Sequence, residues 1–123
     1  MVARGINNPT MAKPTNPILA TTRPNVLPLE GEIDLHISPR VAISLTQMTQ
    51  KKVDPLVVDL SRVTYIDSSG LAVLIEAMQK TEEYGGKFAL AAPQENVRSI
   101  FEIARLDQVF RIFPDVDAAL AAG

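Results

Sequence analysis

One stretch of the chain, residues 56–78, constrains the fold more than any other part of the sequence. Its first residues, 56–60, are mostly apolar and partly β-branched, which is typical of a strand buried on both faces of a parallel sheet. Its last residues place apolar side chains three and four positions apart, as on one helix face: Leu71, Leu74, Ile75 and Met78. Between them lies Asp67-Ser68-Ser69-Gly70, a typical helix start. This order places both serines at the carboxyl end of a strand, where ligands usually sit in open α/β sheets.

The rest of the sequence predicts strands that alternate with helices. Further strands are expected at residues 18–21, 26–33, 88–91 and 109–113, and Ser38, Asn96 and Asp115 are expected to cap further helices. The first two strands should form an antiparallel hairpin, and Pro28 should lie at a sheet edge or a bulge. The predicted fold class is α/β: a single domain with helices packed on a mixed, mostly parallel β-sheet, in the order β-β-α-β-α-β-α-β-α.

The composition restricts the class of protein. The 123 residues suffice for one domain with a sizeable core, and a net charge of −2 gives no reason to expect binding to nucleic acid or to an anionic membrane. The absence of cysteine excludes disulfides, thiol catalysis and zinc-thiolate sites. No apolar run reaches the roughly 20 residues that cross a bilayer, and the N-terminus lacks the apolar part of a secretory signal. We therefore predict a cytoplasmic protein.

The first residues of the chain differ from the rest. Residues 1–16 show no apolar periodicity, and their prolines remove backbone hydrogen-bond donors. We therefore expect residues 1–16 to form a flexible N-terminal tail and residues 17–123 to form the domain.

The sequence offers little for catalysis. His36 is the only histidine, and in a strand it would share a face with Asp34, so a proton-transfer pair can be drawn. A half-exposed histidine in a loop is the favoured interpretation, because nothing else in the sequence supports a catalytic pair. A nucleophilic Ser68 or Ser69 would have only His36 as its base. The scattered carboxylates show no metal-ligand spacing, and both the phosphate-binding loop and the Gly-x-Ser-x-Gly elbow are absent. We predict no catalytic residue, no metal and no cofactor.

The two serines are better suited to accept a phosphoryl group. A phosphate at a helix N-terminus meets unpaired backbone N–H groups and the positive end of the helix dipole, so it should leave the helix folded. It would also add about −1.5 to −2 charges beside Asp67, and a partner that buries this turn would be repelled. The alternative is that Asp67, Ser68 and Ser69 only cap the helix and that Gly70 permits close packing.

Two motifs resemble a known family. The sequence DLSRVTYIDSSGL at residues 59–71 closely resembles the signature of the STAS domain, in its anti-sigma factor antagonist branch. The sequence GEID at residues 31–34 resembles the second-strand motif of that family, and the resemblance covers about residues 17–121. Ala72 stands where many members have glycine, which leaves the turn intact.

The resemblance implies a partner-switching protein. Such a protein, when dephosphorylated, binds an anti-sigma factor that is a serine kinase of the histidine-kinase-like ATPase fold, and thereby releases the sigma factor. The kinase phosphorylates the second serine of the motif, here Ser69, with Ser68 as the alternative, and a metal-dependent serine phosphatase reverses the reaction. The implied partner-binding residues are Asp34, Asp67, Ser68, Ser69 and Gly70. The alternative is a STAS scaffold that binds a protein or a nucleotide without being phosphorylated, in a signalling or transport assembly.

Overall fold

The computed structural model describes residues 16–122, which form an α/β domain around one sheet. Its strands are β2 (Val26–Ile33), β3 (Leu56–Ile66), β4 (Phe88–Ala91) and β5 (Arg111–Phe113), all parallel and in this spatial order. Its helices are α1 (Ser38–Gln50), α2 (Ser68–Glu83), α3 (Glu95–Ile103) and α4 (Val116–Ala122), with a 3₁₀ turn at Leu106–Gln108. The predicted fold class is confirmed. The predicted tail at residues 1–16 lies, except for Asn16, outside the described residues.

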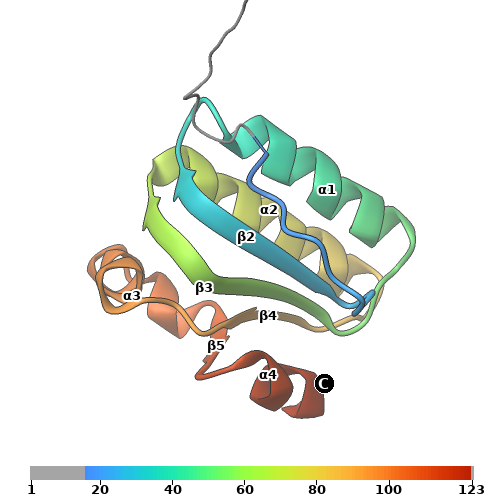
Figure 1. Ribbon diagram of the computed structural model, residues 1–123. Helices are drawn as coiled ribbons and strands as arrows, with labels where there is room; N and C mark the ends of the chain where they lie inside the picture. The colour runs from blue at the N-terminus through green and yellow to red at the C-terminus, as the bar shows by residue number, and fades with distance from the viewer. Residues whose placement is uncertain (1–15, 123) are drawn as a thin grey trace, which may run out of the picture.

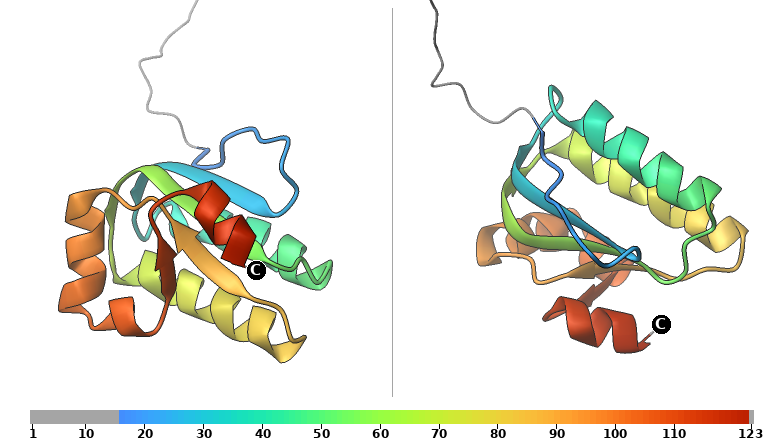
Figure 2. Two further views of the ribbon diagram at one scale, coloured as in Figure 1. Left: turned by 90° about the horizontal axis from the view of Figure 1, so that it is seen from below. Right: turned by 45° about the vertical axis from the view of Figure 1, so that its right-hand side comes forward.

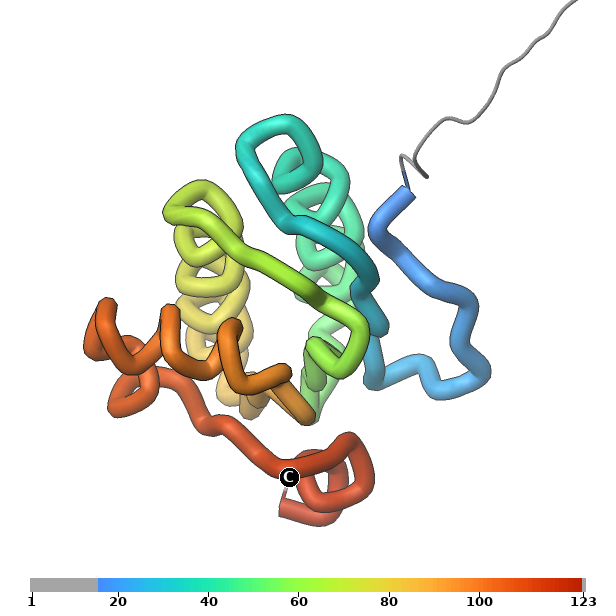
Figure 3. Tube along the Cα trace, turned by 60° about the vertical axis from the view of Figure 1, so that its left-hand side comes forward, coloured from blue at the N-terminus to red at the C-terminus, as the bar shows by residue number. Residues whose placement is uncertain are grey.

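The helices form two layers on the sheet. Helices α1 and α2 lie side by side on one face, and α4 packs on the opposite face (Figures 1 and 2). Figure 3 shows α1 and α2 running together, well separated from α4. Helix α3 packs beside β3. Because every helix follows a strand, the first turns of α1 and α2 both lie at the carboxyl edge of the sheet.

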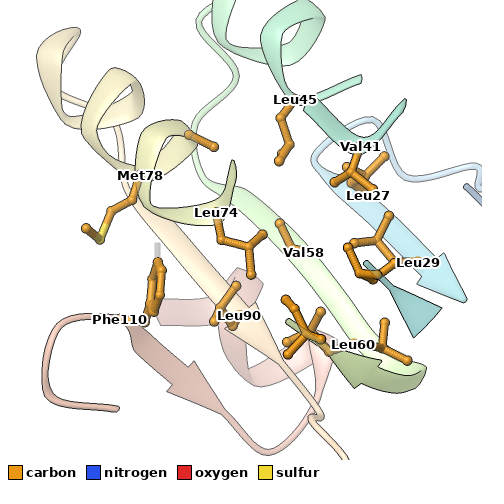
Figure 4. Packing of buried hydrophobic residues seen from close by; sticks show 14 of the residues in the cluster. Leu27, Leu29, Val41, Leu45, Val58, Leu60, Leu74, Met78, Leu90 and Phe110 are labelled. Atoms are coloured by element: carbon orange, nitrogen blue, oxygen red, sulfur yellow. The ribbon is translucent and has the colours of Figure 1, made fainter. Parts of the chain in front are cut away.

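Two buried clusters hold these layers together. On the α1–α2 side, Leu45 of α1 and Leu74 of α2 pack over Val58 of β3 (Figure 4). On the other side, Val57 of β3 packs with Ala119 of α4. Successive β3 residues thus serve opposite faces, as the predicted strand buried on both faces requires. Burying one such side chain contributes about 1.5–3 kcal/mol, so these clusters fix the register of β3 and of the turn that follows it.

The N-terminal strand pair is shorter than predicted. The antiparallel pairing expected for residues 18–21 is reduced to a single bridge between Ile18 and Leu29. The flanking hydrogen bonds run from Leu19 N to Pro28 O and from Glu30 N to Pro17 O, at 2.9 and 2.8 Å. Both prolines act only as acceptors here, which limits the ladder. Strand β2 is an edge strand of the parallel sheet with a register shift after Pro28, as predicted for that residue.

Two of the three predicted helix caps are wrong. Ser38 is itself the first residue of α1 and makes no side-chain cap bond, and the turn before it is held instead by Asp34. Asn96 lies inside α3, and its amide donates to Thr64 O at 2.6 Å. The third cap is confirmed, since Asp115 Oδ1 accepts a hydrogen bond from Ala118 N at 2.7 Å. The last strand begins two residues later than expected, at Arg111.

Candidate functional site

The site is the turn between β3 and α2, where Asp67 is the only residue between strand and helix. Asp67 has an extended backbone, with φ −103° and ψ −173°. Its N–H donates to Ile33 O of β2 at 3.2 Å, and its carbonyl accepts a hydrogen bond from Leu71 N at 3.0 Å. The turn is therefore tied both to the neighbouring strand and to the helix that it starts.

The Asp67 carboxylate accepts four hydrogen bonds. Its Oδ1 accepts from the backbone N–H groups of Ser69 and Gly70 at 2.9 and 3.2 Å, so Asp67 is the N-cap of α2. The same oxygen accepts from the Ser69 hydroxyl, with 2.6 Å between Ser69 Oγ and Asp67 Oδ1. Its Oδ2 accepts from Leu35 N at 3.1 Å. One carboxylate thus caps the helix, orients a serine hydroxyl and holds the turn after β2.

These hydrogen bonds lower the pKa of Asp67. The Ser69 hydroxyl contributes most, burial acts in the opposite direction, and the N–H groups of Gly70, Ser69 and Leu35 lower the pKa further. Asp67 is therefore ionised near neutral pH and is a weak base. It is suited to orienting the Ser69 hydroxyl but not to removing its proton.

The two serines and the glycine differ in exposure. Ser68 is exposed, Ser69 is partly buried and Gly70 is buried. A Cβ atom at Gly70 would lie 2.6 Å from Ile66 Cγ1 and 2.9 Å from Ile33 O, which is too close for any side chain. Glycine at this position lets α2 begin directly against the ends of β2 and β3, so close packing, as the capping interpretation expected, is one of its roles.

The predicted site residues lie at one edge of the sheet. Asp34, Asp67, Ser68, Ser69 and Gly70 belong to two turns that are joined by the hydrogen bond from Leu35 N to Asp67 Oδ2. Asp34 Oδ1 accepts from the backbone N–H groups of His36 and Ile37, both at 3.0 Å.

The structure does not form the proton-transfer pair of Asp34 and His36, in agreement with the favoured interpretation of His36 as a loop residue. His36 lies in a turn and not in a strand, so it shares no strand face with Asp34. The imidazole makes no hydrogen bond to Asp34 or to either serine within residues 16–122. The same residues contain no group of three or more His, Cys, Asp or Glu side chains arranged to hold a metal ion. Across the described chain, no helix is both long and apolar enough to cross a membrane.

Leu35 is the residue of this site that the sequence analysis missed. It contributes a backbone N–H to the Asp67 carboxylate, and its own side chain is exposed. The sequence carried one signal for it. An aspartate directly follows both β2 and β3, and the carboxyl ends of parallel neighbouring strands meet at one edge of the sheet. The residue after the first aspartate, Leu35, could therefore be expected near the second.

Comparison with known proteins agrees with the motif. The family model described as the STAS domain matches residues 17–119. The anti-sigma-B factor antagonist of Listeria monocytogenes is 30% identical over 82 residues, which are 67% of this chain and 72% of that protein.

Solved structures share the fold. The chain is similar to an anti-sigma factor antagonist from Mycobacterium paratuberculosis, with a TM-score of 0.79 and 26% identity over 91% of this chain and 97% of the other. A second similar structure is that of the Bacillus cell fate determinant SpoIIAA, which was solved in its phosphorylated form. Its TM-score is 0.63 at 19% identity, over 84% of this chain and 95% of the other.

Proposed function

The chain belongs to the STAS domain family, among the anti-sigma factor antagonists, and we propose that it is a phosphorylation-switched binding module with no catalytic role of its own. In its dephosphorylated form it binds an anti-sigma factor that is a serine kinase of the histidine-kinase-like ATPase fold, and so releases a sigma factor in the cytoplasm. The proposal makes Ser69 the acceptor, with Ser68 as the alternative, and a metal-dependent serine phosphatase restores the binding form.

One observation carries the proposal: the Ser69 hydroxyl lies 2.6 Å from Asp67 Oδ1, in the first turn of a helix at the carboxyl edge of the sheet. The hydrogen bond fixes the hydroxyl before a partner arrives, which reduces the ordering cost of the reaction. Ser68, beside it, is exposed but makes no hydrogen bond to the Asp67 carboxylate. Orientation by Asp67 therefore favours Ser69. The phosphorylated form of SpoIIAA, a protein of the same fold, is consistent with this use of the fold.

The chemical step follows from the acceptor. Ser69 Oγ forms a bond to the γ-phosphorus of ATP, the bond from that phosphorus to the bridging oxygen breaks, and ADP leaves. The hydroxyl proton passes to a base of the kinase, because the ionised Asp67 has a lowered pKa and is a weak base.

The product explains the switch. A phosphate on Ser69 remains compatible with α2, because it lies at the positive end of the helix dipole. The N–H groups of Ser69, Gly70 and Leu71 already bind Asp67, so the cap of the helix does not depend on the phosphate. It replaces a neutral donor by about −1.5 to −2 charges beside the Asp67 carboxylate. A partner that buries this turn must then bury unpaired negative charge, which typically costs 2–5 kcal/mol, or about thirtyfold or more in affinity. Binding is lost while the fold is kept.

The test is phosphorylation by purified candidate kinases. Each serine kinase of the histidine-kinase-like ATPase fold encoded in the source genome is incubated with the wild type and MgATP, and the phosphate is mapped by mass spectrometry. We expect one kinase to label Ser69, Ser69→Ala to abolish the label, and Ser68→Ala to retain it. Label outside Ser68 and Ser69, or none with every candidate, would contradict the proposal. Unchanged kinase affinity in Ser69→Asp would favour the unphosphorylated scaffold.

A further inference from the structure

Leu35, in the turn between β2 and α1, has an unusual position. Its side chain is 75% exposed. Single exposed leucines are common on protein surfaces, so exposure alone indicates nothing. The described chain has four other exposed large hydrophobic residues: Ile43, Tyr65, Ile103 and Val109. Leu35 differs from them because its own backbone N–H donates to Asp67, the residue that orients the Ser69 hydroxyl.

The turn that carries Leu35 is held in place by hydrogen bonds from its backbone N–H groups. Asp34 Oδ1 accepts from the N–H groups of His36 and Ile37, and Asp34 O accepts from Ser38 N at 2.7 Å. A further bond, from Leu35 N to Asp67 Oδ2, fixes this turn to the start of α2. An apolar side chain on such a turn loses little backbone entropy when a partner covers it.

The exposed face at the start of α2 carries small side chains. Ser68 and Ala72 are exposed and lie four positions apart, so they share one face at the start of α2. Neither can project far from the helix or bury much apolar area. A partner that reaches Ser69 over this face of α2 therefore meets small side chains, and the exposed Leu35 lies on the turn that is bonded to the same Asp67 carboxylate.

We propose that Leu35 is the apolar anchor by which the kinase that phosphorylates Ser69 recognises this chain. This inference rests on the proposed function. The fitting partner is an ATP-binding protein whose surface beside the γ-phosphate carries an apolar depression that receives a leucine. The Asp67 carboxylate sets the distance between anchor and acceptor, because it binds Leu35 N and Ser69 Oγ at once. Leu35 is thus a determinant of which kinase binds, and Ser69 determines whether it binds.

The test compares two exposed aliphatic residues. Leu35→Ala and the control Ile103→Ala, at the end of α3 and 84% exposed in the wild type, are titrated against the kinase that labels the wild type. We expect Leu35→Ala to weaken binding about tenfold, as when one well-packed leucine is lost from an interface, and Ile103→Ala to change it less than twofold. The tenfold ratio should persist when salt is raised from about 0.1 to 0.5 M, since apolar contacts are not screened.

A second variant excludes a folding defect. Because the chain has no cysteine, Leu35→Cys can be alkylated in the folded protein with a bulky neutral group. We expect the alkylated protein to keep its thermal unfolding temperature and to lose kinase binding, whereas alkylated Ile103→Cys binds normally. Wild-type affinity in Leu35→Ala, with Ser69 still phosphorylated, would overturn this inference and leave the proposed function intact. Absence of Ser69 phosphorylation in the wild type would overturn both.

Discussion

The two turns at the carboxyl edge of the sheet begin alike and end differently. Each starts with an aspartate directly after a strand, Asp34 after β2 and Asp67 after β3. Three residues later the first turn has Ile37, still outside its helix, and the second has Gly70, already inside α2. Asp34 binds only backbone N–H groups, whereas Asp67 also binds the Ser69 hydroxyl.

The difference lies in the residues after the aspartate. In the second turn, the buried Gly70 lets α2 start directly against the strands. Ser69 and Gly70 therefore present their N–H groups, and Ser69 also its hydroxyl, to the Asp67 carboxylate. In the first turn, α1 begins only at Ser38, which is followed by Pro39. The Asp34 carboxylate therefore binds N–H groups of a loop that precedes the helix. The same residue type at the same edge gives a structural turn in one place and a candidate acceptor site in the other.

Gly70→Ala should show the largest effect on stability. The added Cβ would collide with the Ile66 side chain and the Ile33 carbonyl, and the carbonyl belongs to a strand that cannot move away cheaply. We expect the free energy of unfolding, measured by urea denaturation, to fall by about 2–3 kcal/mol. The control Ala72→Gly, exposed on the same helix, should cost about 1 kcal/mol or less. Equal or higher stability in Gly70→Ala would show that close packing does not define the second turn.

Truncating the two aspartates compares the turns directly. Asp67→Ala removes the acceptor of four hydrogen bonds and should cost about 2 kcal/mol, near the upper end for an N-cap. Asp34→Ala removes the acceptor of two and should cost about 1 kcal/mol. Urea denaturation of both variants measures which of them loses more free energy of unfolding. A larger loss in Asp34→Ala would mean that the first turn, and not the second, organises this edge.

Acid should reduce the contribution of Asp67. Its folded-state pKa lies below its unfolded-state pKa, so the unfolded chain takes up the proton first and protonation favours unfolding. The stabilisation is present above the unfolded pKa and is lost as pH falls through the lowered folded pKa. The difference in thermal unfolding temperature between the wild type and Asp67→Asn should therefore shrink from pH 6 towards about pH 3. A difference that grows in this range would contradict the direction of the pKa shift.

Ser69→Ala should have the smallest effect on stability and a clear effect on titration. The lost hydrogen bond is only partly buried and should cost about 0.5–1 kcal/mol. Because the Ser69 hydroxyl is the largest cause of the lowered pKa, the pKa of Asp67, followed by NMR of its carboxyl carbon, should rise in this variant. Ser68→Ala is the matched control and should leave the titration of Asp67 unchanged. An unchanged titration of Asp67 in Ser69→Ala would contradict the claim that the hydrogen bond from the Ser69 hydroxyl lowers the pKa of Asp67.

Local patterns in the sequence predicted the second turn well. The strand, the Asp67 cap and the helix all follow from periodicity and from residues that are adjacent in the chain. After α2 the chain has Gly85 at a φ of +81°, a conformation that favours glycine. The features of the second turn that could be predicted depend on residues only a few positions apart in the sequence.

Contacts between residues far apart in the sequence account for several of the errors. Asn96 resembles a cap, but its amide binds Thr64 O, 32 residues away. The last strand starts after Phe110, whose ring packs with the distant rings of Phe88 and Phe101. Leu35 joins the site through a hydrogen bond that also spans 32 residues. Sequence periodicity does not report such pairs. The choice of Ser69 as the acceptor stays a prediction.

The most direct test of the account is the affinity of one kinase for two forms of this chain. The wild type is prepared unphosphorylated and phosphorylated at Ser69, and each form is titrated with the kinase that labels it. We predict that phosphorylation weakens binding at least about thirtyfold while the circular dichroism spectrum and the thermal transition persist. Equal affinity of the two forms, or loss of the folded state on phosphorylation, would contradict a switch that acts on the surface and spares the fold.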